Sequence, residues 1–215
     1  MGKSVYSIVL DDDVIRGIDI MAVQQGTSRS NMINRLLAQH ISMPTAETML
    51  EEVYNSINEV MNCHSTLALQ MLGNGNMINM RSALQYKYNP SVKYSVELFE
   101  KGGYNGQLKI SMRSQNSALI AVMDSFFAVW AQLEMQYSGI DSTEFSFEKG
   151  RYVRLLRKDG SETFNEYGRK IAMYVDLLDG CMKEYFGNIA VSSAAASNSA
   201  VKKYLAGISA DLVRI

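Results

Sequence analysis

Residues 3–41 place a short alternating strand directly ahead of two short amphipathic helices, and this order constrains the fold more than any other part of the sequence. Side chains alternate between the two faces of a strand, so residues 3–10 divide into an apolar face and a mixed face. The apolar face holds Tyr6, Ile8 and Leu10, and the mixed face holds Lys3, Val5, Ser7 and Val9.

Helix signals follow at once. Asp11 is a favourable N-cap, and Asp12 and Asp13 put negative charge at the positive end of a helix dipole. Gly26 predicts the end of this helix, because glycine adopts the left-handed conformation at little cost, and Ser28 predicts the cap of a second helix. The apolar stripes consist of Val14, Ile18, Met21 and Ala22 in the first helix and Ile33, Leu36, Leu37 and Ile41 in the second.

A unit of this length is too small to hold a stable core alone, and a lone strand has two unpaired edges. Pairing two copies about a two-fold axis meets both needs, because the strands join as an antiparallel ribbon whose apolar face lies on four helices. The sequence therefore predicts an obligate homodimer. Its predicted core consists of Tyr6, Ile8, Leu10, Ile18, Ile33 and Leu37.

This order of parts resembles the ribbon-helix-helix family of DNA-binding proteins, the group of CopG, Arc and MetJ. The resemblance depends on the alternation that ends at Leu10, the helix start Asp11–Val14, and the turn Gly26-Thr27-Ser28-Arg29-Ser30 that leads into Met32-Ile33. It covers residues 3–41 of the 215. Proteins of this group place strands in a DNA groove.

The resemblance implies a function for the mixed face and for the start of the second helix. The family pattern directs the mixed face, Lys3, Val5, Ser7 and Val9, into the major groove of double-stranded DNA. Backbone N–H groups at a helix start can hold a phosphate, here at Ser28, Arg29, Ser30 and Asn31. The expected protein is a homodimeric transcriptional regulator that binds a roughly palindromic site.

Two features depart from the family pattern. Val5 and Val9 can touch a thymine methyl group but form no hydrogen bonds to bases. The four cations of the segment, Lys3 among them, are balanced by four aspartates, so its formal charge is zero. A dimeric scaffold, in which the ribbon only pairs protomers, is the alternative hypothesis. An antitoxin fits less well, because residues 44–215 have the composition of a globular domain.

Pro44 predicts a domain boundary, with a ribbon-helix-helix domain over residues 1–43 and a second domain over residues 44–215. The second domain is predicted to be α+β, with helices packed on an antiparallel sheet, and to serve effector sensing or oligomerisation. The predicted helices span 46–72, 117–137, 164–186 and 199–215. Three predicted strands, 78–88, 92–100 and 107–112, form an antiparallel meander, and residues 145–158 are predicted to form another strand or a hairpin with a bend at Gly150. The apolar seam of helix 46–72 fits either a coiled coil or packing within its own domain, and residues 191–199 predict a joint or loop.

Residues for catalysis or metal binding are sparse. The chain has two histidines, His40 and His64, and two cysteines, Cys63 and Cys181, without the spacing of a zinc site or a disulfide framework. No phosphate-binding glycine motif is present, so we expect neither an enzyme nor a bound cofactor. A net charge of −1 argues against indiscriminate coating of nucleic acid. No apolar run suggests a membrane span, and a cytoplasmic location is expected.

One basic cluster remains, formed by Lys149, Arg151, Arg154, Arg157 and Lys158. In a strand these charges divide between both faces. They predict a solvated edge strand that is protected from pairing by its charge. The alternative is an additional phosphate contact beside the operator.

Overall fold

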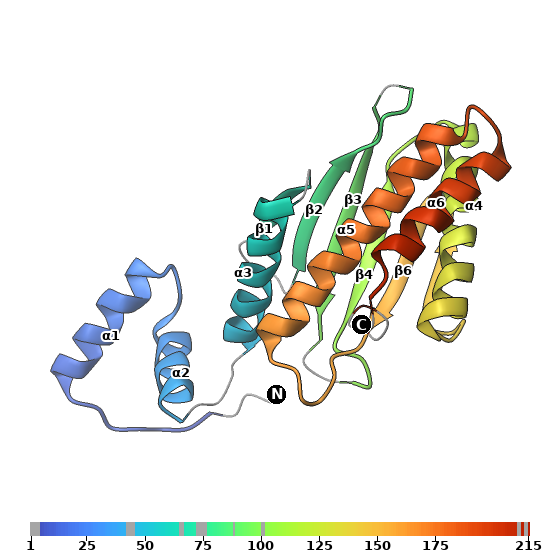
Figure 1. Ribbon diagram of the computed structural model, residues 1–215. Helices are drawn as coiled ribbons and strands as arrows, with labels where there is room; N and C mark the ends of the chain where they lie inside the picture. The colour runs from blue at the N-terminus through green and yellow to red at the C-terminus, as the bar shows by residue number, and fades with distance from the viewer. Residues whose placement is uncertain are drawn as a thin grey trace. The chain divides into compact units, whose positions relative to one another are not determined.

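The computed structural model describes residues 5–41, 46–64, 67–71, 77–87, 89–99, 102–209, 212 and 215 (Figure 1). Contacts divide the chain into two compact units, residues 1–49 and residues 50–215. The predicted boundary around Pro44 falls on residues 42–45, which lie outside the described part. The chain as a whole is α+β, as the sequence predicts.

The first unit contains the two predicted helices, α1 (Asp12–Gln24) and α2 (Arg29–His40). Gly26 adopts a left-handed φ of 61° between them, and the Ser28 side chain accepts a hydrogen bond from the Asn31 N–H, 3.3 Å away. These contacts confirm the predicted helix end and the predicted cap.

The first element of the described chain is a helix, so the ribbon is not present in the single chain. Residues 5–10 form no strand, although Figure 1 shows them as a drawn-out stretch before α1. A ribbon strand takes its hydrogen bonds from a second chain, and the predicted strand over residues 3–10 therefore remains a prediction about the dimer.

The second unit contains a six-stranded antiparallel sheet with the order β1-β2-β3-β4-β6-β5. Its strands are β1 (Ala68–Met71), β2 (Met77–Ala83), β3 (Ser91–Leu98), β4 (Gly106–Met112), β5 (Phe145–Glu148) and β6 (Arg151–Leu156). The predicted meander and the predicted hairpin at Gly150 are confirmed. The first predicted strand ends at Ala83 rather than at residue 88.

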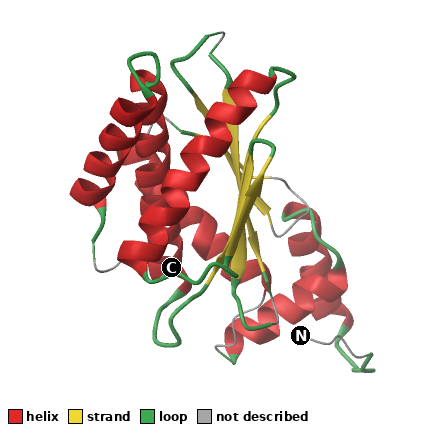
Figure 2. Cartoon of the chain, turned by 90° about the vertical axis from the view of Figure 1, so that its right-hand side faces the viewer, coloured by secondary structure: helices red, strands yellow, loops and turns green. Residues whose placement is uncertain are grey.

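The helices of this unit are α3 (Ala46–His64), α4 (Ser117–Leu133), α5 (Phe164–Asn188) and α6 (Ser193–Gly207), with a π-helical turn η1 (Glu134–Ser138) after α4. Side chains cap three of them: Asn116 caps α4, Thr163 forms a capping box with Glu166 on α5, and Ser192 caps α6. Figures 1 and 2 show the long helices α4, α5 and α6 on one side of the sheet.

Three predicted helix boundaries are wrong, since α6 also ends at Gly207 rather than at residue 215. Helix α3 ends at His64 rather than at residue 72, and residues 68–71 form β1 instead. Helix α6 begins at Ser193, inside the predicted loop 191–199, because Ser192 caps it and small side chains let it approach α5 closely. Its buried face consists of Ala196, Ala200 and Tyr204, whereas Leu205 is 47% exposed.

The core lies between the sheet and the helices. Tyr94, Ile110 and Tyr152 stand in one row across β3, β4 and β6, and they are completely buried together with Phe126 and Trp130 of α4. The seam of α3 belongs to the same core, through Leu50, Val53, Ile57 and Met61. Of the two predicted uses of that seam, packing within its own domain is observed.

Residues 117–138 are long and apolar enough to cross a membrane by length and composition, with a mean hydropathy of 1.4. This corrects the expectation that no stretch of the chain reaches that length. In the fold, Met123, Phe127 and Trp130 of this stretch have no exposed surface. A buried helix in the centre of a core has the same composition.

Gly168 of α5 permits a close approach of this helix to α3. A Cβ at this position would lie 2.8 Å from the Val53 carbonyl oxygen and 2.9 Å from the Ser56 Cβ of α3. We predict that Gly168→Ala lowers the free energy of unfolding by about 1–3 kcal/mol, as overpacking typically does. Urea denaturation followed by circular dichroism measures this change.

Gly187 of the same helix supplies the control, because a Cβ there meets nothing within 4 Å. Gly187→Ala should leave the stability unchanged or raise it by up to ~1 kcal/mol. Equal stability losses in both variants would contradict the close contact of α3 with α5.

Candidate functional site

The first unit has a small core of its own. Ile18 and Ala22 of α1 pack against Met32 of α2, with Leu10, Ile33 and Leu36 at the edge of this cluster. Only Ile18 of the predicted dimer core is buried here, at 8% exposure. The helix pair is therefore held by three buried side chains, and most of its apolar surface is open.

The other predicted dimer-core residues are exposed or half-buried in the single chain. Tyr6 is 83% exposed, and Ile8 and Leu37 are both 57% exposed. Leu10 and Ile33 are half-buried. Leu10 and Ile33 pack against the small cluster that contains Ile18, whereas Tyr6, Ile8 and Leu37 belong to neither core cluster of the described residues.

The predicted base-facing residues lie on the same stretch. Val5 and Val9 are fully exposed, at 100% and 101%, and Ser7 is exposed as well. Lys3 lies outside the described residues. Their exposure leaves them accessible to a large partner such as a duplex.

Arg29, predicted to contact phosphate, is held by an acidic partner instead. Its Nε donates to Asp19 Oδ1 at 2.7 Å and its NH2 group donates to Asp19 Oδ2 at 2.6 Å. This pairing lowers the pKa of Asp19 and raises that of Arg29. The bidentate pair ties the start of α2 to α1, and a phosphate at Arg29 would have to compete with Asp19.

The remaining residues at the start of α2 have mixed roles. Ser28 and Asn31 are joined by the cap, and Ser30 is exposed. The described contacts thus assign Ser28 and Asn31 to helix capping, whereas a phosphate contact by this turn remains a prediction. His40, at the other end of α2, is also exposed.

A buried ionic cluster lies in the second unit, where sequence reasoning placed none. Arg154 of β6 forms an ion pair with Glu134 of η1, with NH1 and Oε2 3.1 Å apart and both side chains 1% exposed. The Tyr174 hydroxyl donates to the same Oε2 at 2.7 Å and accepts from Trp130 Nε1 at 3.0 Å. The Arg154 guanidinium also lies 4.3 Å from the centre of the Tyr174 ring and donates to the Ile215 carbonyl at 2.9 Å.

This cluster corrects the predicted solvated edge strand. Arg154 shares its face with the buried Tyr152 and Leu156, and β5, not β6, lies at the edge of the sheet. The alternation of Tyr152, Arg154 and Leu156 indicates that Arg154 shares a face with two apolar residues, but the charge of Arg154 suggested an exposed position. Arg157 does lie at the surface, where it contacts Glu144 and Tyr104.

The cluster is closed to solvent, so its described role is structural. It joins β6, η1 and α5 through charged and polar contacts in the centre of the unit. Burial raises the pKa of Glu134, and the Arg154 guanidinium and the Tyr174 hydroxyl oppose that rise. A substrate cannot reach either charge without opening the core.

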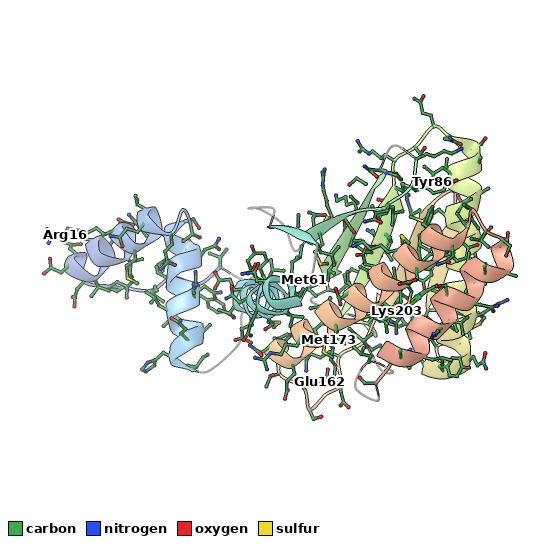
Figure 3. All side chains as sticks on the ribbon, turned by 45° about the horizontal axis from the view of Figure 1, so that its top comes forward. Arg16, Met61, Tyr86, Glu162, Met173 and Lys203 are labelled. Carbon is green, nitrogen blue, oxygen red and sulfur yellow. The ribbon has the colours of Figure 1, made fainter. Side chains whose placement is uncertain are left out.

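A more accessible hollow of about 410 Å³ lies among α3, α5 and α6. Val60, Met173 and Leu177 give it apolar walls, and Lys203 and Asp176 add charge at its side. Figure 3 labels two of these residues, Met173 of α5 and Lys203 of α6. Asp179, also in its lining, accepts from the Tyr94 hydroxyl at 2.7 Å and pairs with Lys183 at 2.7 Å. Its size is within the range of small-ligand sites.

Groups for metal or redox chemistry are few in the described chain. No cluster of three or more His, Cys, Asp or Glu side chains that could hold a metal occurs among the described residues. Cys181 is a buried free thiol, and burial raises its pKa to about 12. The side chains of Cys63 and His64 are outside the described part.

The buried pair yields a double-mutant prediction. Arg154→Met leaves Glu134 buried without its counter-charge, and Glu134→Leu does the reverse, so each should cost about 3–5 kcal/mol of stability. The double variant should cost less than either single variant, because no buried charge remains. Chemical denaturation of the four proteins measures the coupling energy, and strictly additive losses would refute a mutual pair.

Comparison of the chain with family models, with curated proteins and with solved structures gives no match. The ribbon-helix-helix resemblance of residues 3–41 therefore stays an expectation drawn from the residues themselves. A function for this chain has to be argued from the exposure, charge and contacts given above.

Proposed function

We propose that the chain is a homodimeric DNA-binding transcriptional regulator, whose residues 3–10 pair with those of a second copy as an antiparallel ribbon. The helix pair with its turn at Gly26 and its cap at Ser28 supports the ribbon-helix-helix order of parts. In this proposal the ribbon enters the major groove and the second unit responds to an effector or extends the assembly.

One observation carries the proposal: the first unit leaves most of its apolar side chains in water. Among the described residues of this unit, the buried apolar side chains are Ile18, Ala22 and Met32. The exposed large apolar residues are Val5, Tyr6, Ile8, Val9, Val14, Ile20, Met21, Val23, Leu37 and Ile41. Burying one such side chain contributes roughly 1.5–3 kcal/mol, so a shared core of several from each copy can offset the cost of association, about 4–15 kcal/mol.

The chemistry of the outward face suggests what kind of site would be bound. Val5 and Val9 offer methyl groups, which match the C5-methyl group of thymine, and Ser7 offers one hydroxyl that can donate or accept. With a formal charge of zero in the segment, few phosphate contacts are available there. The proposed operator is therefore thymine-containing, and binding by the ribbon should have a shallow salt dependence.

A dimeric scaffold is the second candidate, and specific contacts favour it. Val5 and Val9 are fully exposed apolar residues, which protein surfaces cover as readily as thymine does. Arg29 is already paired with Asp19. Under this hypothesis the ribbon joins two copies and the second unit contacts another protein.

The alternation of the ribbon yields a prediction about assembly. Ile8→Lys places a charge in the proposed dimer core, whereas Val9→Lys places the same charge on the outward face. We predict that Ile8→Lys abolishes the dimer at micromolar concentration and that Val9→Lys preserves it, as measured by sedimentation velocity. A monomeric wild type, or equal effects of the two variants, would refute the ribbon.

DNA binding is tested with the duplex upstream of the gene that encodes this chain. We predict a sequence preference at 100 mM salt that Ser7→Ala combined with Arg29→Ala weakens by roughly 5–150-fold, corresponding to about 1–3 kcal/mol. Arg16→Ala is the control, because Arg16 is an exposed arginine of the same unit that pairs with Asp13. A dimer without any sequence preference would favour the scaffold.

A further inference from the structure

The second unit has a sheet face that α4, α5 and α6 leave open. Tyr94, Ile110 and Tyr152 point to the helix side, where they are buried, so the residues between them point to the other side. Figures 1 and 2 show the three long helices on the same side of the sheet. The opposite face carries the exposed Arg81 and Arg151, although the small side chains of Asn79 and Ser95 on it are buried.

A row of cations crosses this open face. Arg81 of β2 pairs in register with Lys93 of β3, Lys93 pairs with Ser111 of β4, and Ser111 pairs with Arg151 of β6. Arg81 and Arg151 are exposed and Lys93 is half-buried. Like charges directly opposite each other on neighbouring strands destabilise a sheet, so the pairing of Arg81 with Lys93 is unfavourable unless an anion compensates it.

In a neighbouring row of the same sheet face, a cation is paired with an acidic side chain. Lys109 of β4 forms an ion pair with Glu97 of β3 at 3.0 Å, and Gln107 donates to the same carboxylate. For Arg81, Lys93 and Arg151, no ion pair occurs within the described part of the chain. Glu148 of β5 pairs in register with Arg151, so the row carries three cations against one carboxylate and presents a net positive charge.

Further cations lie at the same end of the sheet. Arg113 follows β4 directly, and Lys149 occupies the turn between β5 and β6; both are exposed. Two acidic residues lie beside this turn: Glu148 is 3.9 Å from Lys149, and Asp124 accepts a hydrogen bond from the Gly150 N–H at 2.7 Å. Since the whole chain has a net charge of −1, this concentration of positive charge is local.

We propose that this row, Arg81, Lys93 and Arg151, contacts the phosphate backbone of duplex DNA. Strands β2 and β6 are three strand spacings apart, about 14 Å, which is close to the ~12 Å width of the major groove. Arg81 and Arg151 can thus reach phosphates on the two sides of one groove. The strand positions of this face hold no aromatic residue, so stacking on single-stranded bases is disfavoured.

This surface would add sequence-independent affinity to the ribbon, and in that sense the inference rests on the proposed function. It would also supply positive charge for phosphate contacts, because residues 3–41 have a formal charge of zero. Phosphate contacts position a protein on DNA without reading its sequence. The first unit would then provide sequence specificity, and the second unit would provide electrostatic affinity for DNA.

The test compares three forms of the full chain on a mixed-sequence duplex of 30 base pairs, by fluorescence anisotropy at several salt concentrations. The sheet variant carries Arg81→Thr, Lys93→Thr and Arg151→Thr. The control variant removes the same charge from exposed positions of α5 and α6, with Arg169→Ala, Lys202→Ala and Lys203→Ala. Circular dichroism verifies that all three are folded.

The sheet variant should reduce the slope of log K against log salt by about 2.7 per protomer, because each phosphate contact contributes about 0.9. The control variant should keep the wild-type slope. Equal slopes in all three proteins would overturn this inference. A change of oligomeric mass in the sheet variant would do so too, because the row would then face a second copy.

Two combinations of results distinguish this inference from the proposed function. Loss of sequence preference in Ser7→Ala with Arg29→Ala, with an unchanged slope in the sheet variant, keeps the ribbon and rejects the sheet surface. A reduced slope in the sheet variant, with no sequence preference in the wild type, keeps the sheet surface and rejects the specific regulator. Displacement of the duplex by polyglutamate as effectively as by free DNA would overturn the sheet surface as a DNA site.

Discussion

The function proposed for this chain depends on one constraint: the first unit cannot remove its own apolar side chains from water. Helices α1 and α2 bury Ile18, Ala22 and Met32 against each other, and Tyr6, Ile8 and Leu37 remain open. An extended segment with apolar side chains and free backbone groups gains from pairing with a second copy, because pairing satisfies hydrogen bonds and covers side chains together.

The second unit buries its apolar side chains in a core of its own. Its core closes around Trp130, Tyr152 and Tyr174, and the buried pair of Arg154 with Glu134 joins sheet and helices at its centre. A pair of this kind contributes little net stability compared with apolar residues of the same size, but breaking it is costly. It therefore disfavours alternative packings of β6 and η1, whereas the open sheet face and the hollow among α3, α5 and α6 remain for interactions.

Local signals predicted much of this fold. The cap at Ser28, the turn at Gly26 and the alternation of side chains in β2, β3 and β4 depend on interactions within a few residues. The helices and the antiparallel meander could therefore be predicted from the sequence. The error at residues 68–71 arose because Leu67 and Met71 also continue the helical seam, and a short apolar run fits either structure. Arg154 was predicted to be solvated because its partner Glu134 belongs to another element. Residues 193–199 were predicted as a loop because small residues occur both in loops and at close helix contacts. The ribbon involves a second molecule, and a single chain contains no test of it.

Amide hydrogen exchange of residues 5–10 at increasing protein concentration tests the central claim most directly. In an antiparallel ribbon, alternate residues direct their N–H groups at the partner strand. The proposed dimer predicts that every second amide of this stretch becomes protected as the concentration rises, in step with the dimer population. Exchange at the rate of an unstructured peptide at every concentration would contradict pairing of the two N-terminal segments.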